Sequence, residues 1–118
     1  MLFYIKKSPG ISLKLNYKNK YIEIAKNTIL ESIDKEKTSV FLFGSRADNT
    51  FTDDSDLDIG LLSDEKIDLL LFHKIREKLE KSVVPYHIDL VDLRRTDEEF
   101  RNIALDNAVI WNKGKNFS

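Results

Sequence analysis

The sequence predicts a single α/β domain of the α+β type, in which a small mixed sheet is flanked by helices. Three short apolar runs have the length of strands, at residues 39–43, 57–62 and 86–91. The segments around them carry apolar residues at helical spacing. Because two neighbouring strands joined by a helix form a crossover unit, the sheet should contain parallel pairing and be mixed overall. A chain of 118 residues suits one domain, which we expect to span residues 1–118.

The first part of the chain is predicted to contain one helix and one buried strand. The helix runs from about residue 17 to residue 37, and residues 1–16 are expected to form an N-terminal extension. The strand, Ser39–Phe43, ends at Gly44, where a residue without Cβ turns freely. Residues 45–49 are expected to form a turn of helix whose N-terminus faces bound phosphate. The apolar stripe of the first helix consists of Ile22, Ala25, Ile29 and Ile33.

A second strand, a helix and a third strand are predicted to follow. Leu57–Leu62 is the second strand, and Asp64 is expected to cap a helix that ends near Ser82. Pro85 breaks the chain before the third strand, Tyr86–Val91. This strand can lie beside the second one. The buried face of the intervening helix is expected to consist of Ile67, Leu70, Leu71, Ile75 and Leu79.

A last helix and a short apolar segment complete the predicted elements. Thr96 and Glu99 have the spacing of a capping box, in which each side chain accepts from the other residue's backbone N–H. Val109–Trp111 is the apolar segment after this helix. The inward-facing residues of the helix are expected to be Phe100, Ile103, Ala104 and Ala108.

One segment of the chain carries a specific chemistry. Gly44 and Ser45 are followed by a gap of ten residues and then by Asp56-Leu57-Asp58. Backbone N–H groups of the glycine turn and the Ser45 hydroxyl can hold phosphate oxygens. Asp56 and Asp58 are two apart on a strand, so their carboxylates share one face and repel by roughly 4 kcal/mol at ~4 Å and an effective dielectric of about 20. A proton or a divalent cation between them relieves that repulsion.

Two simpler readings explain less of this segment. A solvated acidic turn accounts for Asp53 and Asp54 but not for Asp58, which lies inside an apolar run. A calcium loop is the sharper alternative, but its sixth position requires glycine and is Ile59 here, and strands rather than helices are predicted on both sides. The residues that match positions one, three, five and twelve of such a loop are Asp54, Asp56, Asp58 and Glu65.

The glycine-serine pair, the gap of about ten residues and the Asp-x-Asp pair resemble the signature of the DNA polymerase β-like nucleotidyltransferase superfamily. Every position of that signature is filled. The chain looks most like the minimal nucleotidyltransferases, stand-alone proteins of about this length, and the likeness covers a core of roughly residues 20–112. The resemblance implies the nucleotidyltransferase fold and a third acid on a following strand. Asp89 is the matching position, whereas strand alternation puts Asp92 on the opposite face.

The resemblance also implies Mg²⁺-dependent transfer of a nucleotidyl group from ATP to a hydroxyl. Asp89 is expected to help hold a second ion and to accept the proton of the attacking hydroxyl. Arg46 is expected to neutralise charge on the leaving pyrophosphate. The three catalytic carboxylates, which are also the expected ligands of two Mg²⁺ ions, are Asp56, Asp58 and Asp89. The expected nucleotide-binding residues are Gly44, Ser45 and Arg46.

Stand-alone members of the resembled family are antitoxins that act on a ribonuclease toxin of the HEPN class. They transfer AMP from ATP to a tyrosine of the toxin and so silence it. The resemblance therefore implies an antitoxin and protein adenylyltransferase, with ATP and a cognate HEPN toxin as partners. Two alternatives remain open at this point: an antitoxin that binds its toxin without catalysis, and a nucleotidyltransferase for small molecules such as antibiotics.

Composition narrows the classes further. The net charge of −1 argues against nucleic-acid binding driven by bulk charge. The absence of cysteine excludes disulfides and thiolate metal sites and suits a reducing compartment. No apolar run approaches the ~20 residues that a membrane helix needs. We therefore expect a cytoplasmic protein that binds neither membranes nor nucleic acid directly.

Overall fold

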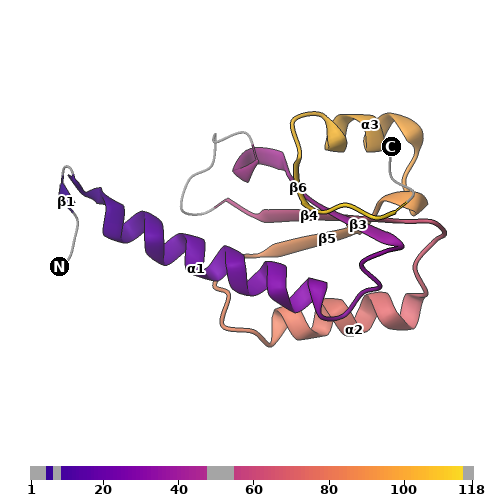
Figure 1. The fold of residues 1–118 in the computed structure, drawn as a ribbon, viewed down its shortest axis with the longest axis horizontal. Coiled ribbons are helices and arrows are strands. Elements are labelled where there is room, and N and C mark those ends of the chain that lie inside the picture. The colour runs from indigo at the N-terminus through magenta and orange to yellow at the C-terminus, as the bar shows by residue number, and fades with distance from the viewer. Residues whose placement is uncertain (1–4, 7–8, 48–54, 116–118) are drawn as a thin grey trace.

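A four-stranded sheet in the order β5-β4-β3-β6 forms the centre of the computed structural model, which describes residues 5–6, 9–47 and 55–115 (Figure 1). Strand β4 is antiparallel to β3 and parallel to β5, while β6 is antiparallel to β3. The prediction of a mixed sheet with the third predicted strand beside the second is confirmed. The four strands are β3 (Thr38–Phe43), β4 (Leu57–Ser63), β5 (Ile88–Asp92) and β6 (Val109–Asn112).

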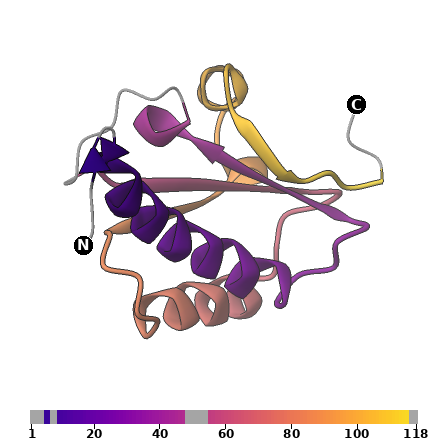
Figure 2. The ribbon, with the colours of Figure 1, turned by 60° about the vertical axis from the view of Figure 1, so that its left-hand side comes forward.

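Helices cover both faces of this sheet. Two long helices lie against one face and a short helix lies against the other, as the turned view shows most clearly (Figure 2). The first two are α1 (Ile11–Leu30) and α2 (Leu69–Glu80), and the third is α3 (Glu98–Leu105). The remaining described elements are the short strands β1 (Ile5–Lys6) and β2 (Pro9–Gly10) and the 3₁₀ turns η1 (Gly44–Arg46) and η2 (Leu93–Arg95).

Strand alternation divides the buried side chains between the two faces. Leu57, Ile59 and Leu61 of β4 are fully buried in the cluster under α1 and α2. Phe41 of β3 points the other way, into a smaller cluster with Leu93 and Ala104 of the α3 side. The middle strands are thus buried on both faces, which explains why they read as nearly continuous apolar runs in the sequence.

The first helix begins and ends earlier than predicted. Helix α1 starts at Ile11, inside the segment expected to be an extension, and ends at Leu30 rather than near residue 37. The chain then turns, because the Asp34 carboxylate accepts from the backbone N–H of Glu36 at 3.0 Å and the Asp34 carbonyl accepts from Thr38 N at 3.0 Å. A short polar side chain that bonds its own backbone in this way competes with helix formation.

Helix α2 is capped by Asp68, not by Asp64 as predicted. The Asp68 carboxylate accepts from Leu71 N at 3.2 Å, and the helix begins at the next residue. Two residues predicted to be inward, Leu70 and Leu71, are therefore exposed, while Ile67 is buried ahead of the helix. The buried residues of the helix itself are Phe72, Ile75 and Leu79.

The last helix also has a different cap. Asp97 accepts from Phe100 N at 2.7 Å, whereas the Thr96 hydroxyl donates to the Leu93 carbonyl, so the predicted capping box is wrong. Phe100 and Ile103 are exposed instead of inward, and Ala104 is buried as expected. Two strand boundaries shift as well: the segment Val109–Trp111 becomes strand β6, and β5 begins two residues later than predicted. No helix of the described chain is long and apolar enough to cross a membrane.

Candidate active site

The residues of the predicted site meet at one end of the sheet. The antiparallel register of β3 and β4 sets Phe43 opposite Asp58, so Gly44 follows directly beside that carboxylate. The parallel register of β4 and β5 sets Asp58 opposite Asp89. Asp56 lies just before β4 begins. The end of one strand and the beginnings of two others therefore bring together residues that are 45 positions apart between Gly44 and Asp89.

Gly44 is required by both its backbone and its surroundings. Its φ of +74° lies in the left-handed region, which side chains other than glycine rarely adopt. A Cβ at this position would collide with Oδ2 of Asp58 and lie 3.1 Å from its Cγ. The turn closes through a bond from Ala47 N to the Gly44 carbonyl at 3.0 Å, and Ser45 within it is half-buried. The glycine turn and the Asp58 carboxylate are thus in direct contact.

Asp58 is electrostatically strained by its neighbours. Burial raises the pKa of the Asp58 carboxyl above its usual value, and the charges of Asp89 and then Asp56 raise it further. His87 opposes this shift. Asp58 is half-buried, whereas Asp56 and Asp89 are exposed. The charges of Asp56 and Asp89 therefore act on Asp58. Its environment favours binding of a proton or of a cation to the Asp58 carboxylate.

The donor set fits a hard cation that arrives with its substrate. Within the described ranges, no three side chains of the His, Cys, Asp or Glu type are placed to hold a metal ion by themselves. Mg²⁺ does not need such a cage, since it commonly binds one or two carboxylates together with substrate phosphates. The neighbouring carboxylates of Asp58 and Asp89, beside a turn suited to phosphate, match that requirement.

Asp92 has a different environment from Asp89, as strand alternation predicted. It is buried, and its carboxylate accepts from Ile67 N at 3.0 Å, Arg94 N at 3.1 Å and Arg95 Nε at 3.2 Å. These hydrogen bonds join the end of β5 to the segment before α2 and to the turn that follows β5. Asp92 is thus a structural acid, and Asp89 remains on the side of the other two.

Arg46 is buried, with an exposed fraction of 5%. Its Nε and Nη2 atoms both donate to the carbonyl oxygen of Ser55, at 3.2 and 2.9 Å. Its Cζ lies 4.1 Å from the centroid of the Tyr86 ring. Neither Ser55 nor Tyr86 was identified from the sequence, because nothing local indicates that the two would meet Arg46. The predicted contact between Arg46 and pyrophosphate stays a prediction.

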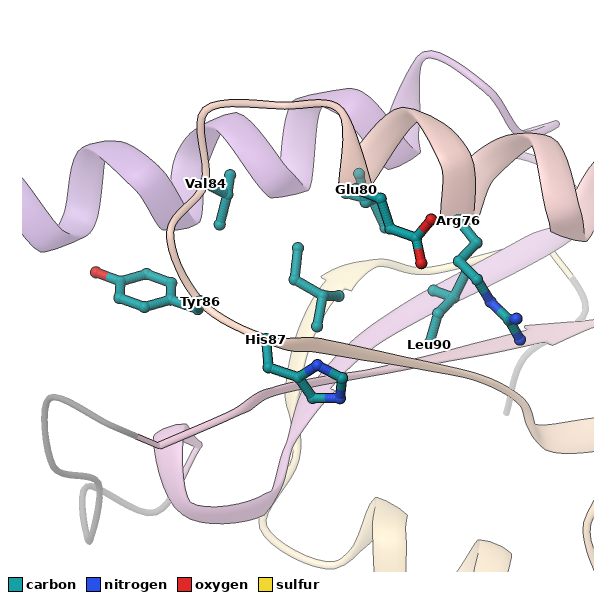
Figure 3. A pocket seen from close by; sticks show the side chains of 8 residues that line it. Arg76, Glu80, Val84, Tyr86, His87 and Leu90 are labelled. Carbon is teal, nitrogen blue, oxygen red and sulfur yellow. The ribbon is translucent and has the colours of Figure 1, made fainter.

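A pocket of about 220 Å³ lies between α2 and the outer edge of β5 (Figure 3). The imidazole of His87 points away from α2, and its charge acts on the Asp58 carboxyl. His87 is not among the residues predicted for the site, although it lies two residues before Asp89 and strand alternation places both on one face. The apolar residues that line the pocket include Leu79, Ile88 and Leu90, and the charged or polar ones include Arg76, Glu80 and His87.

Comparison with known proteins agrees with this geometry. The family model described as "Polymerase beta, Nucleotidyltransferase" matches residues 19–116. The chain is 36% identical over 97 residues to a Haemophilus influenzae protein named probable protein adenylyltransferase MntA, covering 82% of this chain and 83% of the relative. The match to the family model includes both the glycine turn and the region of the three acids.

Solved structures share the fold. A chain in a crystal structure described as the toxin-antitoxin with AMP-PNP superposes with a TM-score of 0.61 and 25% identity, covering 77% of this chain and 74% of that one. A second match, at 22% identity and a TM-score of 0.55, is to a structure of a tri-AMPylated Shewanella oneidensis HEPN toxin in complex with MNT antitoxin. It covers 78% of this chain and 71% of that one, and it supports the fold alone.

Proposed function

Because this chain belongs to the polymerase beta nucleotidyltransferase family, we propose that it is an antitoxin acting as a protein adenylyltransferase. It transfers AMP from ATP to a tyrosine hydroxyl of a cognate HEPN ribonuclease toxin and thereby neutralises it. The observation that carries the proposal is the contact between the Gly44 turn and Asp58, with Asp89 next to it. A phosphate-binding turn and paired carboxylates in one site are what nucleotidyl transfer requires.

Each site residue has a distinct role in this reaction. The Gly44 turn and the Ser45 hydroxyl hold the terminal phosphates, while Asp56 and Asp58 face the triphosphate. The acceptor oxygen attacks the α-phosphorus, the bond to pyrophosphate breaks, and the hydroxyl proton passes to the Asp89 carboxylate. When bound, Mg²⁺ neutralises triphosphate charge and orients the phosphates for in-line displacement. The residues that would hold two such ions are Asp56, Asp58 and Asp89.

We propose that the acceptor of the AMP group is a protein, because the names of two similar proteins support this. The relative with 36% identity is named a protein adenylyltransferase, and the matched crystal structure with AMP-PNP is of a toxin-antitoxin. The same comparison supports ATP as the substrate. An ATP-dependent reaction and a chain without cysteine suit the cytoplasm.

Label transfer from ATP separates this function from its alternatives. The protein is incubated with a cognate HEPN protein and with ATP that carries the label in the α-phosphate or in the γ-phosphate. We expect label on the HEPN protein from the α-phosphate alone, and none with Asp58→Ala. A stable complex without label would make the chain a non-catalytic antitoxin. Label on an aminoglycoside instead of the protein would make it a small-molecule enzyme.

A further inference from the structure

We propose that Arg46 is a positioning residue of this site: its buried guanidinium fixes the phosphate-binding turn relative to the carboxylates, rather than contacting the nucleotide. The inference rests on the proposed nucleotidyl transfer. Arg46 directly follows Ser45, and it bonds Ser55, which directly precedes Asp56. The two ends of the segment between the turn and the acidic pair are thereby joined.

The hydrogen bonds from Arg46 to Ser55 hold two segments of the chain together, and we call this contact the clamp. Arginine presents its donors in a rigid planar fork, and here two of them converge on the single carbonyl oxygen of Ser55. A charged donor makes a stronger hydrogen bond than a neutral one. Burying a guanidinium is costly unless its donors are bonded, so these bonds also keep Arg46 in place. Lysine, with a point charge on a flexible stem, does not reproduce this fork.

Tyr86 connects the clamp to the third carboxylate. Its ring lies beneath the Arg46 guanidinium, with 4.1 Å from Cζ to the ring centroid. Tyr86 lies three residues before Asp89 and stacks edge-to-face on Tyr21 of α1, with 6.3 Å between the ring centroids. Arg46 thus holds together three segments, each of which carries or borders a predicted site residue.

Loss of the Arg46 contact should slow the reaction, because catalytic sites tolerate little displacement of their reacting groups. Misplacement of a reacting group by ~1 Å can cost about 100-fold in rate, and loss of a residue that orients a metal ligand typically costs ~10- to 100-fold. Arg46→Met and Arg46→Lys should both lower kcat by about 10- to 100-fold at saturating ATP. Both should also raise the Mg²⁺ concentration for half-maximal rate and lower the calorimetric affinity for ATP·Mg²⁺ by about tenfold.

Arg101 provides a matched control. Its Nε and Nη2 atoms also donate to backbone carbonyls, those of Leu93 at 3.0 Å and Thr96 at 3.2 Å, but on the side of α3. Arg101→Met should lower the melting temperature to a similar extent as Arg46→Met while changing kcat by less than about twofold, because it holds no site residue. A loss of stability alone is thereby separated from a loss of positioning.

Tyr86 variants test the second link. Tyr86→Leu should lower kcat in the same direction as Arg46→Met, and Tyr86→Phe should lose less because the ring remains. The double variant Arg46→Met with Tyr86→Leu should be little worse than Arg46→Met alone, because the two side chains act through one contact. Fully additive losses contradict the clamp. If Arg46→Met does not fold, Arg46→Lys and Tyr86→Leu decide by the same criteria.

Two results overturn the inference. If Arg46→Lys matches the parent while Arg46→Met binds ATP·Mg²⁺ poorly, Arg46 acts as a charge on the phosphates. If both match the parent in kcat and in affinity, the clamp has no influence on the site. Failure of the proposed function looks different: the parent itself then transfers no AMP, and the calorimetric affinities still test whether Arg46 shapes the nucleotide site.

Discussion

Gly44 and Asp58 are in such close contact that any side chain at position 44 would collide with the Asp58 carboxylate. The two residues belong to the two halves of a motif that are separated in sequence by a gap of ten residues. The strand register explains the contact, because Phe43 of β3 is paired with Asp58 of β4. Antiparallel pairing at the end of the sheet therefore brings the two halves of the motif together across that gap.

The first prediction follows from this contact. Gly44→Ala should lower stability by about 1–3 kcal/mol, since a non-glycine residue is strained at this φ, and should largely abolish ATP·Mg²⁺ binding by displacing Asp58. Gly60→Ala is the control. The Cβ that this substitution adds would lie 2.9 Å from Leu93 Cδ1. Gly60→Ala should therefore also lower stability, but it leaves the Gly44 turn intact. Calorimetry with both variants decides: normal ATP·Mg²⁺ affinity in Gly44→Ala would remove the turn from the site.

The second prediction concerns pH and Asp58. Its pKa is raised, so the native protein binds this proton more tightly than the unfolded chain, and stability falls as pH rises from the usual value of 3.8 through the folded pKa. Without Mg²⁺, Asp58→Asn should melt higher than the parent at about pH 7, by ~4 °C for each kcal/mol of repulsion relieved. The advantage should shrink as pH falls to about 4.

Thermal unfolding at several pH values measures this difference. Asp106→Asn, at an exposed acid at the end of α3, is the control for the loss of one negative charge. Adding ATP·Mg²⁺ should stabilise the parent more than Asp58→Asn, because the cation then satisfies the carboxylate. An Asp58→Asn variant that melts lower than the parent at neutral pH without metal contradicts the electrostatic account.

The third prediction separates Asp89 from Asp92. Asp89→Asn should bind ATP·Mg²⁺ but transfer AMP about 10²- to 10⁴-fold more slowly, because the proton acceptor is lost. Asp92→Asn should keep both properties and lose about 1–3 kcal/mol of stability, since its buried carboxylate accepts three hydrogen bonds. Single-turnover kinetics beside thermal melting tests both. The opposite pattern, with slow transfer in Asp92→Asn only, would make Asp92 the third site acid.

The fourth prediction concerns the Ser45 hydroxyl. Ser45→Ala should weaken ATP·Mg²⁺ binding by about 10- to 150-fold, the loss expected for a hydrogen bond to a charged group of roughly 1.5 to 3 kcal/mol. Ser82→Ala is the control, because this hydroxyl donates to the Leu79 carbonyl at the end of α2, away from the acids. Equal affinities in the parent and Ser45→Ala would leave the backbone of the turn as the phosphate ligand.

Some of the architecture could be predicted because it depends on local pattern. The β3 and β4 strands are short apolar runs, and alternation along β5 alone separates Asp89 from Asp92. The helix boundaries could not be predicted as well. Several acids could have capped α2, and the choice of Asp68 over Asp64 turned Leu70 and Leu71 outward. Cap choice depends on tertiary packing that single-sequence spacing does not contain.

Some residues of the candidate site could likewise be predicted from the sequence, and others could not. Gly44, Ser45, Asp56 and Asp58 lie within one contiguous motif, so residue type and spacing indicate their roles. The clamp of Arg46 could not be predicted, because it depends on a backbone carbonyl and on a ring 40 positions away at Tyr86. A carbonyl carries no sequence signature, and an arginine beside a phosphate-binding turn favours the simpler expectation of a phosphate contact.

The most direct test of the central claim is peptide mass spectrometry of the cognate HEPN protein after incubation with this chain and ATP·Mg²⁺. We predict that a tyrosine of the HEPN protein gains the mass of AMP with the parent, that the mass is unchanged with Asp58→Ala, and that its ribonuclease activity falls in parallel with the modification. A HEPN protein that remains unmodified by the folded parent, under conditions where the two proteins bind and ATP·Mg²⁺ is saturating, would contradict the account.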